Sequence, residues 1–252
     1  MATQILSGRE RFIAPDPVAT ANPSFSENLL TLCASAIFAG LSPRELMEIL
    51  SCARMRTFAR DEVLYSQGQT ARGLIVLQSG SVKHTQLSSN GDEVLLRMSG
   101  NGEAVNLQTG PTGCNHTCSA RAMEHCRAWV WEYNRLQELL ERYPRLRANI
   151  TQILSSRLQE LEERFREIAT EKVARRLALV LLRLMKQLGK KTSDGTQVSM
   201  SREELAQMTG TTLFTISRVL SRWADQGLVA SRREAVIILD ADRLGSVSEE
   251  MF

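Results

Sequence analysis

The sequence lacks any long hydrophobic run. Its longest apolar stretch, Cys33 to Leu41, is far shorter than the roughly 20 residues that a membrane-spanning helix needs. No basic segment precedes a signal-like sequence either. The five cysteines include no CxxC pair, which favours reduced thiols over a disulfide framework. We therefore expect a cytoplasmic protein that has no membrane partner.

Signatures of enzymes are missing as well. The sequence contains no nucleophile elbow, no P-loop and no paired acid/base motif. A cupin-like metalloenzyme needs clustered histidines and a carboxylate on facing strands, and the spacing of His84, His116 and His125 does not suggest that geometry. We keep it only as a remote alternative and expect a protein that is not an enzyme. The net charge of +3 is too mild to identify a nucleic-acid partner by itself.

The pattern of apolar and polar residues changes twice in the N-terminal half of the chain. Residues 1–26 hold several prolines among small polar residues and predict a flexible extension. A helical lead-in follows from Glu27 to about Met55, and Ser42 and Pro43 have the positions of an N-cap and the first helical residue. The next region consists of short apolar runs. It marks the start of a different kind of structure.

Short strands are predicted between Phe58 and Glu132, where glycines recur every 11 or 12 residues. Asn90 and Gly91 lie between two of these strands and favour a hairpin with a type I′ turn, in which both residues have positive φ. Many short strands at regular spacing are typical of a sandwich or jelly roll. We expect residues 27–134 to form such a domain.

Helical periodicity replaces the strand pattern over residues 135–169, interrupted only at Pro144. Apolar residues on this segment step by four and three positions, as in a coiled-coil seam: Leu154, Leu158, Leu161, Phe165 and Ile168. Charged residues flank the seam. A stripe this narrow predicts a dimerisation helix. The alternative is a helix whose stripe packs on its own β-domain.

Residues 170–252 predict a DNA-binding domain. After a helix that ends near Gly189, Ser201 and Glu204 form a capping box for a short helix that stops near Gly210. Either Thr211 or Thr212 caps the next helix. Two helices joined by such a turn make a helix-turn-helix, whose second helix enters the major groove of DNA. The alternative is a helical hairpin whose arginines only face solvent.

The surface of this domain is predicted from its apolar and basic residues. The apolar face that joins the two helices comprises Leu205, Ala206, Ile216, Val219, Leu220 and Trp223. Two strand-like pieces joined through Arg232 and Arg233 predict a wing. From Thr212 to Arg233 there are four arginines and one acid, a local phosphate-binding patch. The predicted DNA-binding residues are Ser201, Thr211, Thr212, Phe214, Thr215, Ser217, Arg218, Arg222, Arg232 and Arg233.

Three segments in order resemble the CRP/FNR transcription regulators. "EVLYSQG", "IVLQSGSV" and "NGDEVLL" resemble the β-roll strands of that family, the seam resembles its dimer helix, and "SREELAQMTGTTLFTISRVLSRWADQGLV" resembles its helix-turn-helix. The resemblance implies an α+β fold: an N-terminal β-roll (jelly roll) sensor domain, a long dimerisation helix and a C-terminal winged helix-turn-helix domain. It implies a homodimer that binds double-stranded promoter DNA, has RNA polymerase as a partner and responds to an effector in the β-roll.

The same resemblance implies roles for residues of the second helix. Thr212 and Thr215 fall where the family contacts phosphates, and Arg218 falls where it reads a base. Arginine can donate two hydrogen bonds to guanine. Phe214 stands where the family commonly has glutamate, so we expect a different target sequence. The alternative for Phe214 is packing inside the domain.

The residues of the family's cyclic-nucleotide site are replaced. Where those members have glycine and glutamate, and then arginine and serine, this chain has Asn106, Leu107, His116 and Thr117. A buried phosphate would lack compensation here, so we expect an effector other than cyclic AMP. The predicted effector pocket comprises Asn106, Leu107, Cys114, His116, Thr117 and Cys118.

The stretch from Gly110 to Cys126 contains soft ligands: Cys114, His116, Cys118, His125 and Cys126. They leave a haem- or thiol-based gas or redox sensor as the alternative function, with haem as its possible cofactor. A structural interpretation competes with it. In that interpretation Cys118 and Cys126 are small core residues of strands, His116 is a loop residue, and no cofactor is bound.

Overall fold

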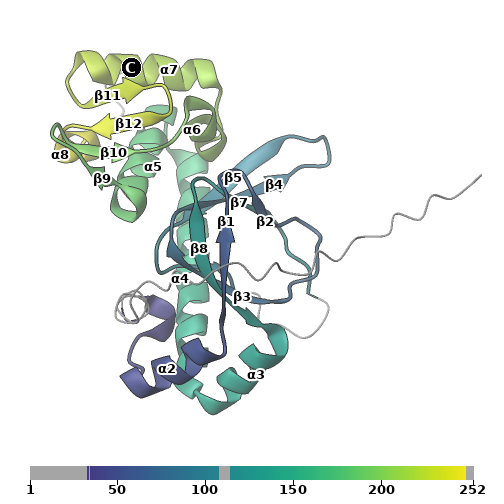
Figure 1. Ribbon diagram of the computed structural model, residues 1–252. Helices are drawn as coiled ribbons and strands as arrows, with labels where there is room; N and C mark the ends of the chain where they lie inside the picture. The colour runs from purple at the N-terminus through teal and green to yellow at the C-terminus, as the bar shows by residue number, and fades with distance from the viewer. Residues whose placement is uncertain (1–32, 34, 108–113, 248–252) are drawn as a thin grey trace, which may run out of the picture.

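The computed structural model describes residues 33, 35–107 and 114–247. The predicted extension over residues 1–26 and the beginning of the stretch from Gly110 to Cys126 lie outside the described residues. Figure 1 shows a β-sandwich beside a long helix, with α2 (Pro43–Ser51) and α3 (Tyr133–Arg142) at one end and a smaller α/β unit at the other. This arrangement confirms the predicted α+β fold class.

The β-sandwich, which we call the β-roll, consists of two antiparallel sheets with strand orders β1-β8-β3-β6 and β2-β7-β4-β5. Its strands are β1 (Arg54–Phe58), β2 (Val63–Tyr65), β3 (Gly73–Ser79), β4 (Val82–Leu87), β5 (Glu93–Ser99), β6 (Ala104–Asn106), β7 (Ser119–Ala122) and β8 (Cys126–Glu132). Apolar residues from both sheets fill the space between them, among them Phe58 and Leu77 of the first sheet and Val82 and Ala120 of the second.

Strand β8 belongs to two cores because successive side chains of a strand point to opposite faces. Cys126 and Ala128 face the interior of the β-roll, whereas Trp129 and Trp131 pack against η1 (Ala36–Phe38), α2 and α3. The indole Nε1 of Trp131 donates a 2.7 Å hydrogen bond to the carbonyl oxygen of Ile49 in α2. The helices therefore cover the outer face of the first sheet.

The helical lead-in is shorter than the sequence predicts. Ser42 caps α2 with a capping box, and Pro43 is its first residue, as expected. However, α2 ends at Ser51 and β1 begins at Arg54, so Met55 belongs to the β-roll. Met55 pairs with Trp129 of β8, and this pairing with a strand far along the chain extends the sheet past the predicted boundary.

The β4–β5 hairpin exists, but the predicted type I′ turn is wrong. The strands are joined by a longer loop over residues 88–92, and among Asn90 and Gly91 only Gly91 has a positive φ, of 88°. The hydroxyl of Ser88 accepts from the backbone N–H groups of Asn90 (3.2 Å) and Asp92 (3.1 Å). These bonds satisfy the loop amides without a positive φ at Asn90.

Helices continue from the β-roll to the C-terminal unit. Pro144 divides the predicted helical segment into α3 and α4 (Pro144–Thr170), and α5 (Val173–Leu188) follows with Gly189 as its C-cap. Buried Glu167 of α4 accepts from Arg183 of α5 through both guanidinium Nη atoms, at 2.7 and 2.8 Å. None of the described helices is long and apolar enough to span a membrane.

The C-terminal unit packs directly on the β-roll. It contains α6 (Arg202–Thr209), α7 (Leu213–Asp225), α8 (Ala241–Gly245) and a sheet of β9 (Lys190–Lys191), β10 (Thr196–Val198), β11 (Val229–Arg232) and β12 (Ala235–Ile238). Its core includes Leu95 and Met98 of β5. Gly100 lies so near α5 that a β-carbon there would come within 2.7 Å of Leu188 Cδ2. The division into domains at residues 26, 134 and 169 stays a prediction.

Candidate DNA-binding surface and effector site

The helix-turn-helix is built from the predicted caps. The Ser201 hydroxyl accepts from the N–H of Glu204 (3.2 Å), and the Glu204 carboxylate accepts from the N–H of Ser201 (2.9 Å). Gly210 ends α6 in the left-handed region at φ 61°, a conformation that glycine adopts readily. Thr212 then caps α7, its hydroxyl accepting from the N–H of Thr215 (3.2 Å). These local signals fix where α6 and α7 begin.

The apolar face predicted from the sequence is buried as expected. Leu205, Ala206, Ile216, Val219, Leu220 and Trp223 are all at most 6% exposed. The opposite side of α7 presents Phe214, Arg218 and Arg222 to solvent. Phe214 is 74% exposed, so the alternative that it packs inside the domain is wrong. Leu213, 52% exposed beside it, is a further outward residue that the sequence analysis did not select.

The remaining predicted DNA-binding residues occupy two places. Thr211, Thr215 and Ser217 are half-buried around the start of α7. Ser201, Arg232 and Arg233 line a cavity of about 820 Å³ between the C-terminal unit and the β-roll. The predicted wing is present, but Arg233 and Glu234 form its turn instead of Arg232 and Arg233. The predicted phosphate-binding patch therefore ends at Arg233, next to the acidic side chain of Glu234 in the turn of the wing.

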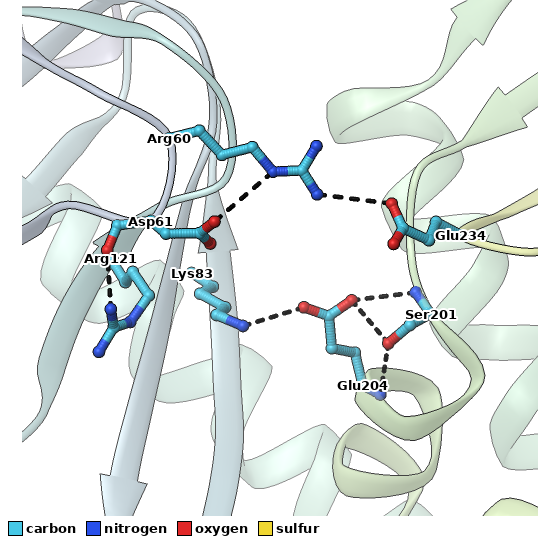
Figure 2. A network of polar contacts seen from close by, with 7 residues as sticks. All are labelled: Arg60, Asp61, Lys83, Arg121, Ser201, Glu204 and Glu234. Carbon is cyan, nitrogen blue, oxygen red and sulfur yellow. Dashed lines mark hydrogen bonds and ion pairs between the residues drawn. The ribbon is translucent and has the colours of Figure 1, made fainter.

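Ion pairs cross between the β-roll and the C-terminal unit, as Figure 2 shows. Lys83 of β4 contacts Glu204 of α6 at 3.1 Å, and these side chains are 21% and 14% exposed. Arg60 contacts Glu234 of the wing at 3.4 Å, with 65% and 66% exposure. Exposed pairs contribute about 0–1 kcal/mol because water and salt screen them. The Lys83–Glu204 pair is the better shielded contact, and Glu204 caps α6 at the same time.

The predicted seam forms one exposed side of α4. Exposed fractions are 44% for Leu154, 58% for Leu158, 56% for Leu161, 76% for Phe165 and 56% for Ile168. The other side of α4 faces the β-roll, where Arg157 donates to Ala104 O (2.6 Å). The alternative that the stripe packs on the chain's own β-domain is therefore wrong. A row of exposed apolar side chains along one helix is typical of an interaction surface.

The predicted effector residues do not share one environment. The buried Asn106 side chain accepts from Ile75 N–H (2.8 Å) and donates to Gly73 O (2.6 Å). Leu107 belongs to the core under α2 and α3. His116 is buried and stacks on Tyr65, with ring centroids 3.7 Å apart. Asn106 and Leu107 thus have structural roles, because the Asn106 side chain bonds to β3 and the Leu107 side chain packs in a core.

The three cysteines of the 114–126 stretch also differ in their exposure to solvent. Cys114 is exposed, Cys118 is half-buried in a bend before β7, and Cys126 is buried at the start of β8. Burial raises the pKa of the Cys118 and Cys126 thiols, which lowers their reactivity at neutral pH. Among the described residues, no three histidine, cysteine, aspartate or glutamate side chains are grouped to hold a metal ion.

Sequence reasoning missed three arginines at the junction of β-roll and α4: Arg97, Arg157 and Arg164. They line a second cavity, of about 490 Å³. Arg157 and Arg164 are seven residues apart, and each directly precedes a seam residue, Leu158 and Phe165 respectively. That heptad spacing was the available signal, because it places both on one side of the helix next to the seam.

Comparisons with known proteins agree with this architecture. The cyclic nucleotide-binding domain family matches residues 55–143, and the Crp-like helix-turn-helix domain family matches residues 175–247. The chain is 27% identical to the cyclic AMP receptor protein of Thermus thermophilus over 85% of this chain and 97% of that protein. It is 28% identical to the transcriptional activator protein Anr of Pseudomonas protegens over 76% of this chain and 79% of that protein.

A solved structure leads to the same class. The fold is similar to that of the c-di-GMP responsive global regulator CLP of Xanthomonas campestris, with a TM-score of 0.69 and 25% identity over 79% of this chain and 100% of that one. The β-roll and the helix-turn-helix define a transcription regulator with an effector-binding domain. The chain belongs to the CRP/FNR family. These relatives are regulators and not enzymes, which confirms the expected class and excludes the cupin alternative.

Proposed function

We propose that this chain is a homodimeric, sequence-specific regulator that binds promoter DNA in the cytoplasm, acts on RNA polymerase and answers to an effector other than a cyclic nucleotide. The observation that carries the proposal is the outward side of α7, where Phe214, Arg218 and Arg222 are exposed on a helix held by a buried apolar face. A recognition helix needs this arrangement to reach base edges in the major groove.

Dimerisation gives the proposed function its geometry. The apolar stripe of α4 supports a parallel pair of α4 helices, which would present two copies of α7. Two recognition helices about 34 Å apart reach successive major grooves on one side of the duplex. An effector that favours one packing of the β-roll against α4 changes the population of the binding-competent arrangement. The promoter target should therefore be a palindrome.

The effector proposal rests on the residues in the family's nucleotide site. Leu107 is packed in a core and cannot accept from a ribose hydroxyl, and the side chain of Asn106 already bonds to β3. Burial lowers the pKa of His116, so this ring is neutral where the family has an arginine. Cyclic AMP should leave the DNA affinity unchanged. Haem tests the alternative sensor: a stoichiometric Soret band that shifts in His116→Ala would support it.

Selection of duplexes from a random DNA library by the purified full-length protein tests the function. We expect a palindromic site, and Arg218→Ala should weaken its binding by about 1–3 kcal/mol, the worth of one bidentate base contact. Arg243→Ala is the matched control, because Arg243 is an exposed arginine on α8 that pairs with Asp240. Unselective binding, or equal affinity of Arg218→Ala and the wild type, would contradict the proposal.

A further inference from the structure

The cavity of about 490 Å³ lies between the β-roll and the helices next to it. Its walls come from residues 35–37 at η1, from the segment between β5 and the first residue of β6, from one side of α4, and from Gln187 of α5. None of the six predicted effector residues lines it. Three of the lining residues are arginines: Arg97 of β5, and Arg157 and Arg164 of α4. The cavity walls thus hold basic residues outside the 114–126 stretch, although the charges of Arg97 and Arg157 also act on the Cys118 thiol of that stretch.

The three guanidinium groups are only partly satisfied by the protein. Arg157 donates to Ala104 O (2.6 Å), Arg164 donates to Leu96 O (2.5 Å), and Arg97 donates to Ser99 Oγ (2.7 Å) and Val105 O (2.5 Å). A guanidinium has five N–H donors, so backbone carbonyls use a minority of them. The Nε of Arg164 is buried and has no hydrogen-bond partner among the described atoms.

Carboxylates compensate the charge of these arginines only in part, because three guanidinium groups share the cavity with two carboxylates, Glu103 and Glu160. Within the part of the chain that the structure describes, none of the three forms an ion pair with an acidic side chain. The Glu103 carboxylate also accepts from Gln187 Nε2 (2.9 and 3.0 Å), and the charges of Glu103 and Glu160 favour the charged forms of Arg97 and Arg157. Burial, followed by the neighbouring Arg97, lowers the pKa of Arg157 to about 10. The cavity keeps an excess of positive charge, and a partly buried excess charge is costly unless a counter-charge is supplied.

We propose that this cavity binds a small oxyanion, a carboxylate or phosphate group held by the guanidinium groups of Arg97, Arg157 and Arg164. Guanidinium groups match both anions because their paired N–H donors fit two oxygens at once. The cavity volume of about 490 Å³ lies within the range of about 300–1,000 Å³ that is usual for pockets that bind small molecules. The inference rests on the proposed function, since it names the chemical class of the effector.

The position of the cavity explains how such a ligand would act on DNA binding. Arg97 belongs to the β-roll, Arg157 and Arg164 belong to the helix that carries the seam, and Gln187 belongs to α5, which leads into the C-terminal unit. Gln187 Nε2 also donates to Met98 O of β5 (3.0 Å). An anion that neutralises arginines from two elements stabilises one packing of these elements over others. It would couple the sensor to the seam and to α5.

Isothermal titration calorimetry of the full-length protein tests the inference, with inorganic phosphate and malonate as separate probes and sodium chloride at matched ionic strength as the control. We expect saturable binding of at least one probe. Arg157→Gln and Arg164→Gln should each weaken it at least tenfold. Arg166→Gln is the matched control, because Arg166 is an exposed arginine on the same helix that pairs with Glu171. Circular dichroism checks that each variant is folded.

The outcomes separate the inference from the proposed function. Binding of phosphate alone, or of malonate alone, supports the inference and identifies the anion class. Absence of saturable binding by both probes, or equal binding by Arg157→Gln, Arg164→Gln and the wild type, overturns it. DNA selection is measured independently. Selective DNA binding without anion binding would support the proposed function and refute the inference. Anion binding without selective DNA binding would support the inference and refute the proposed function.

Discussion

Phe214 is the residue that most changes what α7 can read. Its ring is 74% exposed on the outward side of the helix, where a phenyl group can contact a thymine methyl but can neither donate nor accept a hydrogen bond. A glutamate at this position would accept from cytosine N4. The target sequence should therefore depend on this single side chain.

Phe214→Glu should change the preferred base at one position of each half-site towards cytosine, with a discrimination of about 1–3 kcal/mol. Sequencing of duplexes selected by the variant and by the wild type measures the change. Leu213→Glu is the matched control, since Leu213 is the exposed apolar neighbour and the added charge is the same. An identical base preference for Phe214→Glu and the wild type would show that position 214 does not read a base.

His84 is a second residue with a distinct physical role. It is fully buried, with its ring nitrogens 3.3 Å from the hydroxyl of Tyr65 and 3.0 Å from that of Ser99. Burial, followed by the charges of Arg97 and Arg157, holds the pKa of His84 well below its usual range. The folded protein thus keeps this histidine neutral at pH values where the unfolded chain protonates it.

The free energy of unfolding should fall as the pH drops below about 6.5, because the unfolded state then binds a proton that the folded state does not. Each such histidine contributes a slope of up to about 1.4 kcal/mol per pH unit until its folded pKa is reached. Urea unfolding between pH 7 and pH 5 measures the slope. His84→Gln should make it shallower, whereas His125→Gln, at an exposed position, should not. Equal slopes for wild type and His84→Gln would refute the argument.

At the scale of an element, α4 has two faces with different tasks. One side presents the apolar seam, and the other holds the β-roll through arginines that donate to backbone carbonyls. The salt bridge from Glu167 to Arg183 fixes its C-terminal end to α5. Changes on one face should therefore affect assembly, and changes on the other should affect the response to effector.

Leu158→Glu should break the dimer, because it places a charge in a seam where each apolar side chain contributes about 1.5–3 kcal/mol when buried. Sedimentation velocity measures the oligomeric state, and fluorescence anisotropy measures binding to the selected duplex. Gln159→Glu adds the same charge at an exposed position beside the seam and should leave both unchanged. Full DNA affinity in a demonstrated Leu158→Glu monomer would refute the role of the seam.

Elements specified by neighbouring residues were predictable, and those specified by distant contacts were not. The capping box of Ser201 and Glu204 and the left-handed Gly210 act within one helix, so the sequence predicted both ends of α6. The loop at Asn90 was mispredicted because the Ser88 hydroxyl replaces the backbone bonds of a tight turn. The predicted DNA-binding side chains remain predictions until a complex tests them.

The cavity lined by Arg97, Arg157 and Arg164 is a part of the candidate site that the sequence could not predict. Arg157 bonds to a carbonyl 53 residues away, and Arg164 bonds to one 68 residues away. In the sequence these arginines look like solvent-exposed flanks of a seam. Only the packing of α4 on the β-roll removes them from water, so local patterns carry no information about their partners.

At the scale of the whole molecule, the β-roll and the C-terminal unit are joined by apolar packing and by ion pairs of unequal strength. Leu95 and Met98 of the β-roll enter the core of the C-terminal unit. Lys83 and Glu204 meet at 3.1 Å in a partly buried place, whereas Arg60 and Glu234 meet near the surface. The relative position of the two units therefore depends more on the first pair.

Double-mutant cycles on urea unfolding should show this difference. The cycle of Lys83→Gln and Glu204→Gln should give a coupling energy on the order of 1 kcal/mol. That of Arg60→Gln and Glu234→Gln should stay below about 0.5 kcal/mol, because this pair is screened. Glutamine at position 204 preserves the capping box of α6, so the helix itself is unperturbed. Equal coupling in both cycles would contradict the assignment.

The contacts at Gly100 and Lys83 also limit how freely this sensor can be combined with other DNA-binding units. A graft of a foreign C-terminal unit after Thr170 would have to bring an acid opposite Lys83 and leave room for the close approach of Gly100 to Leu188. A β-carbon at position 100 would require the side chain of Leu188 to move, because Leu188 Cδ2 would lie 2.7 Å from it. Chimeric biosensors made from this protein should therefore exchange β5, β4 and the C-terminal unit as one matched set.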